Sequence, residues 1–209
     1  PPREAEVAAE RLRVGTAAGA LEVAAARFTV AGSVSATEGE PALELSLTAE
    51  GVELPATPAG AAAFGRRIGA LGAEVVLTGP VPPGRHPAAR AEVWRDGGGT
   101  AELRALTLRW GPVGATAAAT LALDEALQPM GAGTLRLSGA VQALEALAEA
   151  GLVTRRAAAT ARAVIPLLSR TPAGGGAPEI EVPLTLEDRT LAIARIPVTR
   201  LMPVVWPER

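Results

Sequence analysis

The sequence predicts an α+β fold in which a curved, mostly antiparallel β-sheet, shaped like half a barrel, packs against about three α-helices. The main observation is a two-residue alternation. In residues 43–48 every odd residue is apolar and every even residue is polar, which gives a strand one buried and one wet face. Strands of this kind belong to antiparallel sheets, because parallel strands are usually covered on both faces.

The same alternation recurs along the chain, in residues 28–30, 120–124, 134–138 and 180–186. The polar residues 187–190 then predict a hairpin turn into a further strand at 191–193.

Two local irregularities are expected within these strands. Pro183 falls at a polar-facing position, and since proline cannot donate to a ladder, its strand should lie at an edge or be bulged there. Leu103 is out of phase with Leu106 and Leu108, which a bulge near Ala105 would correct.

A first helix is expected over residues 57–72. Thr57 followed by proline is typical of a helix start, and Gly72 can end the helix. Three apolar residues at spacings of four and three would share one face of this helix: Phe64, Ile68 and Leu71.

Two more helices are expected to form an αα-hairpin near 141–169. The first covers residues 141–150 and is stopped by Gly151. The second begins near Thr154 and should kink or end at Pro166, because proline removes a helical hydrogen bond.

Composition bounds the function as well as the fold. The 209 residues are 48% hydrophobic and 20% charged, which excludes a disordered chain and predicts a single β-rich domain over 1–209. The formal net charge is −2, and arginines never run beyond a pair, so nucleic-acid binding, which needs clustered cations, is not expected. No apolar run approaches the length needed to span a bilayer.

The search for catalytic chemistry finds no motif. His86 is the only histidine, there is no cysteine, and the three aspartates Asp96, Asp124 and Asp188 each adjoin a predicted turn. No serine lies in a G-x-S-x-G motif, and neither glycine run continues into a phosphate loop. We therefore expect no catalytic residue, no metal ligand and no cofactor. An enzyme would need carboxylates brought together from distant strands.

A family resemblance rests on turn and strand signatures. These are Leu77-Thr78-Gly79-Pro80, Trp94-Arg95-Asp96 before Gly98-Gly99-Thr100, Trp110-Gly111-Pro112-Val113-Gly114, residues 120–124 with Pro129, residues 183–188, Ile196-Pro197-Val198 and Leu201-Met202-Pro203. Over roughly residues 40 to 207 the chain resembles domain-of-unknown-function family 2125 of Gram-negative bacteria. None of these signatures bears chemistry, so no catalytic residue is transferred.

The resemblance implies a location. Members of that family look like periplasmic proteins anchored to the inner membrane by one N-terminal helix, and this chain, which opens at Pro1-Pro2-Arg3-Glu4, is then expected to have lost that anchor. The strands are also similar, more distantly, to those of periplasmic lipid-handling proteins whose curved sheets cradle acyl chains.

Two functions remain open. The first is a non-catalytic binding protein whose apolar sheet face, partly covered by helices, holds or passes a lipid or another hydrophobic ligand. The second is a structural or interaction protein of the envelope, with a solid core and a protein partner of unknown identity. For the first, the expected ligand-binding residues are Phe28, Val30, Leu45, Leu47, Phe64, Ile68, Leu106, Leu108, Trp110 and Leu121.

Overall fold

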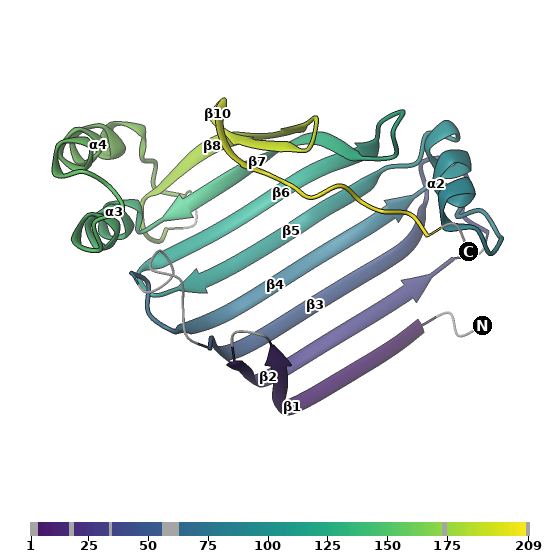
Figure 1. Ribbon diagram of the computed structural model, residues 1–209, viewed down its shortest axis with the longest axis horizontal. Helices are drawn as coiled ribbons and strands as arrows, with labels where there is room; N and C mark the ends of the chain where they lie inside the picture. The colour runs from purple at the N-terminus through teal and green to yellow at the C-terminus, as the bar shows by residue number, and fades with distance from the viewer. Residues whose placement is uncertain (1–3, 17–18, 34, 56–62, 173–174, 208–209) are drawn as a thin grey trace.

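The computed structural model describes residues 4–16, 19–33, 35–55, 63–172 and 175–207. The strands in this part of the chain form one open sheet of ten, in sequence order, and each neighbouring pair is antiparallel (Figure 1). The strands are β1 (Glu4–Thr16), β2 (Gly19–Gly32), β3 (Pro41–Glu53), β4 (Arg67–Thr78), β5 (Ala101–Trp110), β6 (Val113–Leu123), β7 (Pro129–Ser138), β8 (Glu179–Glu187), β9 (Thr190–Ile193) and β10 (Ile196–Arg200). The mostly antiparallel sheet predicted from the sequence is therefore confirmed.

The alternating segments all lie in strands, and the two local irregularities are also present. Leu103 and Leu106 pair with Ala119 and Ala117 of β6, so β5 contains one extra residue between them, as the predicted bulge requires. The β8–β9 ladder begins at Leu184. The half of β8 that contains Pro183 thus has no partner strand on that side among the described pairings.

The predicted helix over 57–72 is wrong where the structure describes it. Residues 57–62 lie outside the described residues, and Arg67–Thr78 is strand β4. Ile68 and Leu71 lie on the same face of β4, and the strand contains one extra residue between them. Their spacing of three residues therefore resembles the spacing on one face of a helix. Leu71, Ala73 and Val75 then alternate with Gly72 and Glu74 as a strand should, whereas the next residue on the other face, Val76, is apolar and only 3% exposed.

One helix was missed. Helix α2 (Pro87–Asp96) follows the exposed His86 and begins with proline, a residue typical of a first helical turn. No helix was expected in this region, because its apolar residues are few and its amphipathic pattern is weak. Strand β1 was missed as well, since alanines interrupt its alternation.

The αα-hairpin is confirmed. Helix α3 (Ala140–Glu149) and helix α4 (Arg155–Leu168) pack against each other, with Gly151 at a φ of 74° between them. Pro166 does not end α4, which continues two residues further. A proline so close to the C-terminus of a helix removes only one hydrogen bond from the last turns.

Helices α2, α3 and α4 of the described residues lie at the ends of the strands (Figure 1). The α3–α4 hairpin follows the end of β7, and α2 lies at the opposite end of the sheet, where the Trp94 indole donates a hydrogen bond of 2.8 Å to the Thr78 carbonyl. These helices therefore lie toward the two ends of the sheet and not across the middle of its apolar face.

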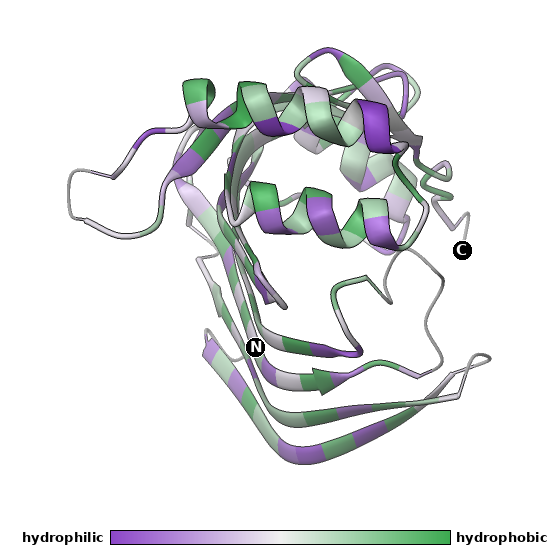
Figure 2. Ribbon diagram, turned by 90° about the vertical axis from the view of Figure 1, so that its left-hand side faces the viewer, coloured by the Kyte–Doolittle hydropathy of each residue, from purple (hydrophilic) through white to green (hydrophobic). Residues whose placement is uncertain are grey.

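The sheet bends sharply, and the bend has a sequence origin (Figure 2). The bend lies between two rows of paired apolar residues that cross β1 to β4. Along each of these strands the members of the two rows are three residues apart, where neighbours on one face of a regular strand are two apart. The pairs, strand by strand, are Leu12 and Ala9, Val23 and Ala26, Val52 and Ala49, and Ile68 and Leu71. The extra residue has a positive φ in two of these strands, 53° at Arg11 and 59° at Gly51.

Residues from both sides of this bend form the packed core. Val23, Ala49 and Val52 are 7–8% exposed and belong to one cluster. Half-buried apolar residues pack around them: Leu21, Ala26, Leu54, Ile68 and Leu71. Because side chains on both sides of the bend belong to one cluster, the apolar face is the inside of the bend. Figure 2 shows α3 and α4 on the same inner side.

Candidate functional site

The cross-strand register places apolar residues in continuous rows across the sheet. We define the central row by the paired residues Val7, Phe28, Leu47, Ala73, Leu106, Ala117, Leu135 and Val182. It crosses eight neighbouring strands, β1 to β8. At about 4.8 Å per strand the row spans roughly 34 Å.

The rows on either side are also apolar. One contains Ala5, Val30, Leu45, Val75, Leu103, Ala119, Gly133 and Leu184, and the other Ala9, Ala26, Ala49, Leu71, Leu108, Ala115, Leu137 and Ile180. We call these three rows, with the residues that continue them to either end of the strands, the apolar face. Residues of the three rows themselves include no charged side chain.

The opposite face of the sheet is charged. Cross-strand ion pairs lie on it, among them Arg136 with Glu181 at 2.8 Å and Arg27 with Glu6. The arginines and glutamates are largely exposed, so these pairs add little to stability. They identify this face as the wet side that the alternation predicted.

Nine of the ten predicted ligand-binding residues lie on strands and share the apolar face. Val30, Leu45 and Leu121 lie toward one end of the strands, and Ile68 pairs with Trp110 toward the other. The remaining residue, Phe64, lies in a turn before β4, with its ring centroid 5.5 Å from that of Trp110. The structure thus brings the nine strand residues to one side of the sheet.

Burial differs strongly along the central row. Val7 is 63% exposed, Phe28 40%, Leu47 38% and Leu106 37%, whereas Ala117 on β6 is only 7% exposed. The large side chains of the row on β1, β2, β3 and β5 are therefore exposed, whereas Ala73 on β4 is half-buried and Ala117 on β6 is buried. Leu47 and Leu106 lie on interior strands, so their exposure does not come from a sheet edge.

Sequence reasoning missed several residues of this face. Val7 was missed because β1 was not predicted. Ala73 and Val75 follow the residues 57–72 that were assigned to a helix, and the strand that contains them was not predicted. Leu135 and Val182 lay in predicted strands but were not included. The alternation of residues 71–77 was the signal that could have found the β4 members.

Each tryptophan donates its indole N–H to a backbone carbonyl and is half-buried. Trp110 donates to Gly65 at 2.8 Å, and Trp206 to Leu127 at 3.0 Å. The segment with Trp206 runs from β10 toward α2 (Figure 1) and is also held by Val204, whose N–H donates to the Gln128 side chain at 2.8 Å. These indoles join segments distant in sequence, in keeping with the amphipathic nature of the ring.

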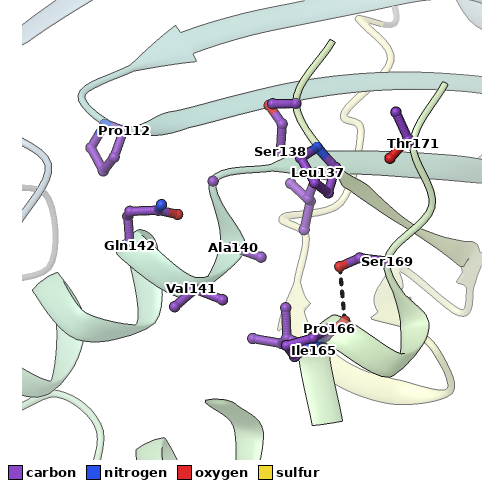
Figure 3. Close-up of a pocket in the computed structure, with 13 residues that line it drawn as sticks. Pro112, Leu137, Ser138, Ala140, Val141, Gln142, Ile165, Pro166, Ser169 and Thr171 are labelled. Carbon is purple, nitrogen blue, oxygen red and sulfur yellow. Dashed lines mark hydrogen bonds between the residues drawn. The ribbon is translucent and has the colours of Figure 1, made fainter. Parts of the chain in front are cut away.

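A separate concavity of about 690 Å³ lies at the end of β7, between α3 and α4 (Figure 3). Its lining is mainly apolar and uncharged: Pro112, Leu137, Ser138, Gly139, Ala140, Val141, Gln142, Ile165, Pro166, Ser169, Thr171, Ala177 and Pro178. The Ser169 hydroxyl donates back to the Ile165 carbonyl at 2.8 Å, which leaves its oxygen able to accept. Leu137 belongs to the apolar face, so the concavity adjoins that face.

Asp124 and Asp188 both lie in turns between strands. The Asp124 carboxylate accepts a hydrogen bond from the Gln128 backbone N–H at 2.8 Å, and Asp188 lies in the β8–β9 turn with a φ of 48°. Within the described ranges, no three histidine, aspartate or glutamate side chains converge as metal ligands. Nor does that part of the chain contain a helix of the length and hydrophobicity that a membrane span requires.

The fold and this face define a class of protein: an open antiparallel meander with one charged face and one apolar face, the second incompletely covered. The chain belongs to domain-of-unknown-function family 2125, described as an uncharacterized protein conserved in bacteria, whose model matches residues 2–202. No curated protein and no solved structure matches it.

Proposed function

We propose that this chain is a non-catalytic binding protein of the bacterial cell envelope, which holds or passes a lipid or another hydrophobic ligand on the apolar face of its half-barrel-like sheet. The observation that supports this most directly is the exposure of Val7, Phe28, Leu47 and Leu106, at 37–63%, in one continuous row.

Exposure of this kind is costly unless something covers it. Burying one large apolar side chain stabilises by about 1.5–3 kcal/mol, and contiguous exposed apolar patches mark binding surfaces more often than scattered residues do. On the central row the small residue Ala73 lies between Leu47 and Leu106, which leaves room above the sheet between these two larger side chains.

The chemistry of the face selects the ligand class. Its three rows contain no charged side chain, whereas the opposite face pairs arginines with glutamates. A ligand lying along the row would therefore be apolar over most of its length and extended, as an alkyl chain is. Shape and burial, and not reactive groups, determine binding at such a site.

The location belongs to the same proposal. The family resemblance supports a periplasmic protein held at the inner membrane by an N-terminal anchor. A protein there would have access to lipid, which is the ligand class that an extended apolar face favours.

The test replaces the open part of the row. Phe28→Gln, Leu47→Gln and Leu106→Gln together should lower affinity for the fluorescent fatty acid cis-parinaric acid by about tenfold or more, since they remove the apolar area that the ligand covers. The measurement is a fluorescence titration of purified protein. The side chains are partly exposed, so the variant should still fold.

The matched control changes the opposite face of the same three strands. Arg27→Gln, Thr48→Gln and Arg109→Gln lie at exposed positions and should leave affinity unchanged. Equal affinity in both triple variants, or no binding by the unmodified protein, would refute a ligand site on the apolar face. Crosslinking that recovers one protein partner on that face would favour the interaction protein.

A further inference from the structure

Strand β1 is a long open edge of the sheet. Among the described residues it pairs only with β2, and all but one of its 13 residues are exposed. Alternate backbone N–H and C=O groups along such a strand point away from its neighbour and can pair with a further strand. The opposite edge, β10, has five residues and contains Pro197, which cannot donate to a ladder. Strand β1 is therefore the edge better suited to pairing.

The bend restricts how two copies of β1 could pair. On β1 the apolar face changes at the bend from odd to even residues: Val7 and Ala9 precede it, and Leu12 and Val14 follow it. Facing residues on antiparallel strands share a face of the sheet. Only one antiparallel register keeps apolar residues opposite each other on both sides of the bend. In that register Val7 faces Val14 of the second copy, and Ala9 faces Leu12 of the second copy.

These facing pairs would cover side chains that the single chain leaves open. Val7 is 63% exposed, and Leu12 and Val14 are each 40% exposed. Because the arrangement is two-fold symmetric, each apolar pair occurs twice. The apolar face of one copy would thus continue into that of the other.

The same register brings opposite charges together at the bend. Glu10 faces Arg11 of the second copy, and by symmetry Arg11 faces Glu10. Within the described ranges neither side chain has an ion pair or a hydrogen bond, and β2 presents only Ala25 and Ala24 to them. A slip of one residue in either direction would set Glu10 against Glu10 or Arg11 against Arg11. It would also turn apolar residues of one copy toward the charged face of the other.

The extra residues at the bend point toward the charged face. Arg11 lies in line with Gly51 of β3 across the sheet. A Cβ built on Gly51 would lie 3.4 Å from the guanidinium of Arg67, which forms an ion pair with Glu53 on the charged face. Arg11 and the exposed Glu10 are therefore on the same side of the sheet.

We propose that β1 is an interface at which two copies of this chain join edge to edge, antiparallel about a two-fold axis, to form one continuous bent sheet. Such an interface uses the same residues of both copies and must be self-complementary. A strand of another protein would have to supply a base opposite Glu10, an acid opposite Arg11 and apolar residues on the inner face. The sequence of β1 supplies all three, and this favours a second copy. The interface goes beyond the proposed ligand site and forms with or without a ligand.

The first experiment is sedimentation velocity of the purified protein over a series of concentrations. We expect a monomer–dimer equilibrium. Glu10→Arg and Arg11→Glu should each raise the Kd of dimerisation about tenfold or more, because each variant places two like-charged pairs across the two-fold axis. An equimolar mixture of the two variants should associate again, since the arginines of one then face the glutamates of the other. Recovery in the mixture shows that both variants fold.

The second experiment tests the register and uses the absence of cysteine from the chain. Val7→Cys and Val14→Cys are prepared as separate variants. Facing Cα atoms on antiparallel strands lie about 4.5–5.5 Å apart, within the range of a disulfide. Oxidation of the mixture should therefore give a covalent dimer on a non-reducing gel. Neither variant alone should crosslink, because each cysteine would lie roughly 20 Å from its own copy.

Two controls match these variants. Ile196→Arg changes a residue that is 67% exposed on the opposite edge strand and should dimerise as the unmodified protein does. Val93→Cys, at a position that is 59% exposed on α2, should not crosslink to Val7→Cys.

Several results would overturn the interface. One is a protein that stays monomeric at every concentration at which it is soluble. Another is a dimer that neither charge variant weakens, or one that Ile196→Arg dissociates, because the contact would then lie elsewhere. A mixture of Val7→Cys and Val14→Cys that crosslinks no more than either variant alone would reject the register on which the proposal rests.

Discussion

Two regions of the same sheet face differ in burial although their residue types are alike. At the corner, Val23 and Val52 are each 7% exposed and pack with residues from both sides of the bend. On the central row, Phe28 and Leu47 of the same two strands are 40% and 38% exposed. The two pairs lie on the same two strands, on the same face of the sheet, and all four residues are hydrophobic. What distinguishes the pairs is their distance from the bend.

The difference shows what an open sheet can and cannot bury by itself. A flat sheet has no second layer to cover its apolar side, so its residues stay half-wet. Folding the sheet back on itself at the extra residues makes the two halves cover each other, but only near the corner. The remainder of the face stays partly exposed.

The largest expected effect comes from the residue at the bend. Gly51 has a φ of 59°, and a Cβ built there would lie 2.9 Å from the Ala24 Cβ. Gly51→Val should therefore cost about 2–4 kcal/mol in free energy of unfolding, from backbone strain and crowding together. Urea denaturation followed by circular dichroism measures it.

Gly15 on β1 is the matched control, because nothing lies within 4 Å of a Cβ built there and its φ is not in the positive range. Gly15→Val should change stability by no more than about 0.5 kcal/mol. If Gly51→Val proved as stable as this control, the bend would not depend on that glycine.

A smaller effect separates the corner from the central row directly. Val52→Ala should cost about 1.5–3 kcal/mol, because it empties space in a packed cluster. Leu47→Ala on the same strand removes more carbon yet should cost less than about 1 kcal/mol, since Leu47 is already partly in water. Thermal unfolding of both variants gives the comparison. The reverse ranking would mean that the central row, and not the corner, is the core.

The smallest expected effect concerns the contribution of the Glu40 charge to the stability of the connection between β2 and β3. The Thr37 backbone N–H donates to the Glu40 carboxylate at 2.9 Å, and this hydrogen bond lowers the pKa of Glu40 from its usual value. Because the pKa of Glu40 is lower in the folded than in the unfolded state, its ionised carboxylate stabilises the folded protein at pH values above the unfolded-state pKa. This stabilisation is lost as the pH falls through the folded-state pKa. Because Glu40 is fully exposed, we expect only a slight loss of folding stability toward acid pH.

The measurement is a pH titration of the melting temperature of the unmodified protein and of Glu40→Gln. The two curves should converge as the pH falls through the folded-state pKa of Glu40. A gap between them that instead widened toward acid would contradict the sign of this linkage.

Some elements of this fold can be predicted from local sequence patterns, and others cannot. Strand β3 was predictable because its alternation is unbroken over residues 43–48, and the α3–α4 hairpin because Gly151 separates two amphipathic segments. Strand β4 was not, because Ile68 and Leu71 lie across the bend and mimic a helix. Helix α2 was not, because its surface is mostly polar and only Ala91 is buried.

For the candidate site, the same division holds. Alternation placed eight of the ten expected residues on one face, since the side-chain period of a strand is local and can be read from the chain. Ile68 lies on the same face, although it was expected in a helix. It could not tell which of them would be exposed. Whether Leu47 is open and Val52 closed depends on what lies opposite them in space.

By itself, then, the amino-acid sequence determined the antiparallel sheet, its two contrasting faces and the helical hairpin, because each follows from periodicity within a few residues. Only the tertiary structure decided that the sheet bends at Gly51, that the helices lie at its ends, and that part of the apolar face stays uncovered. Those features depend on contacts between strands far apart in the chain, which no local pattern encodes.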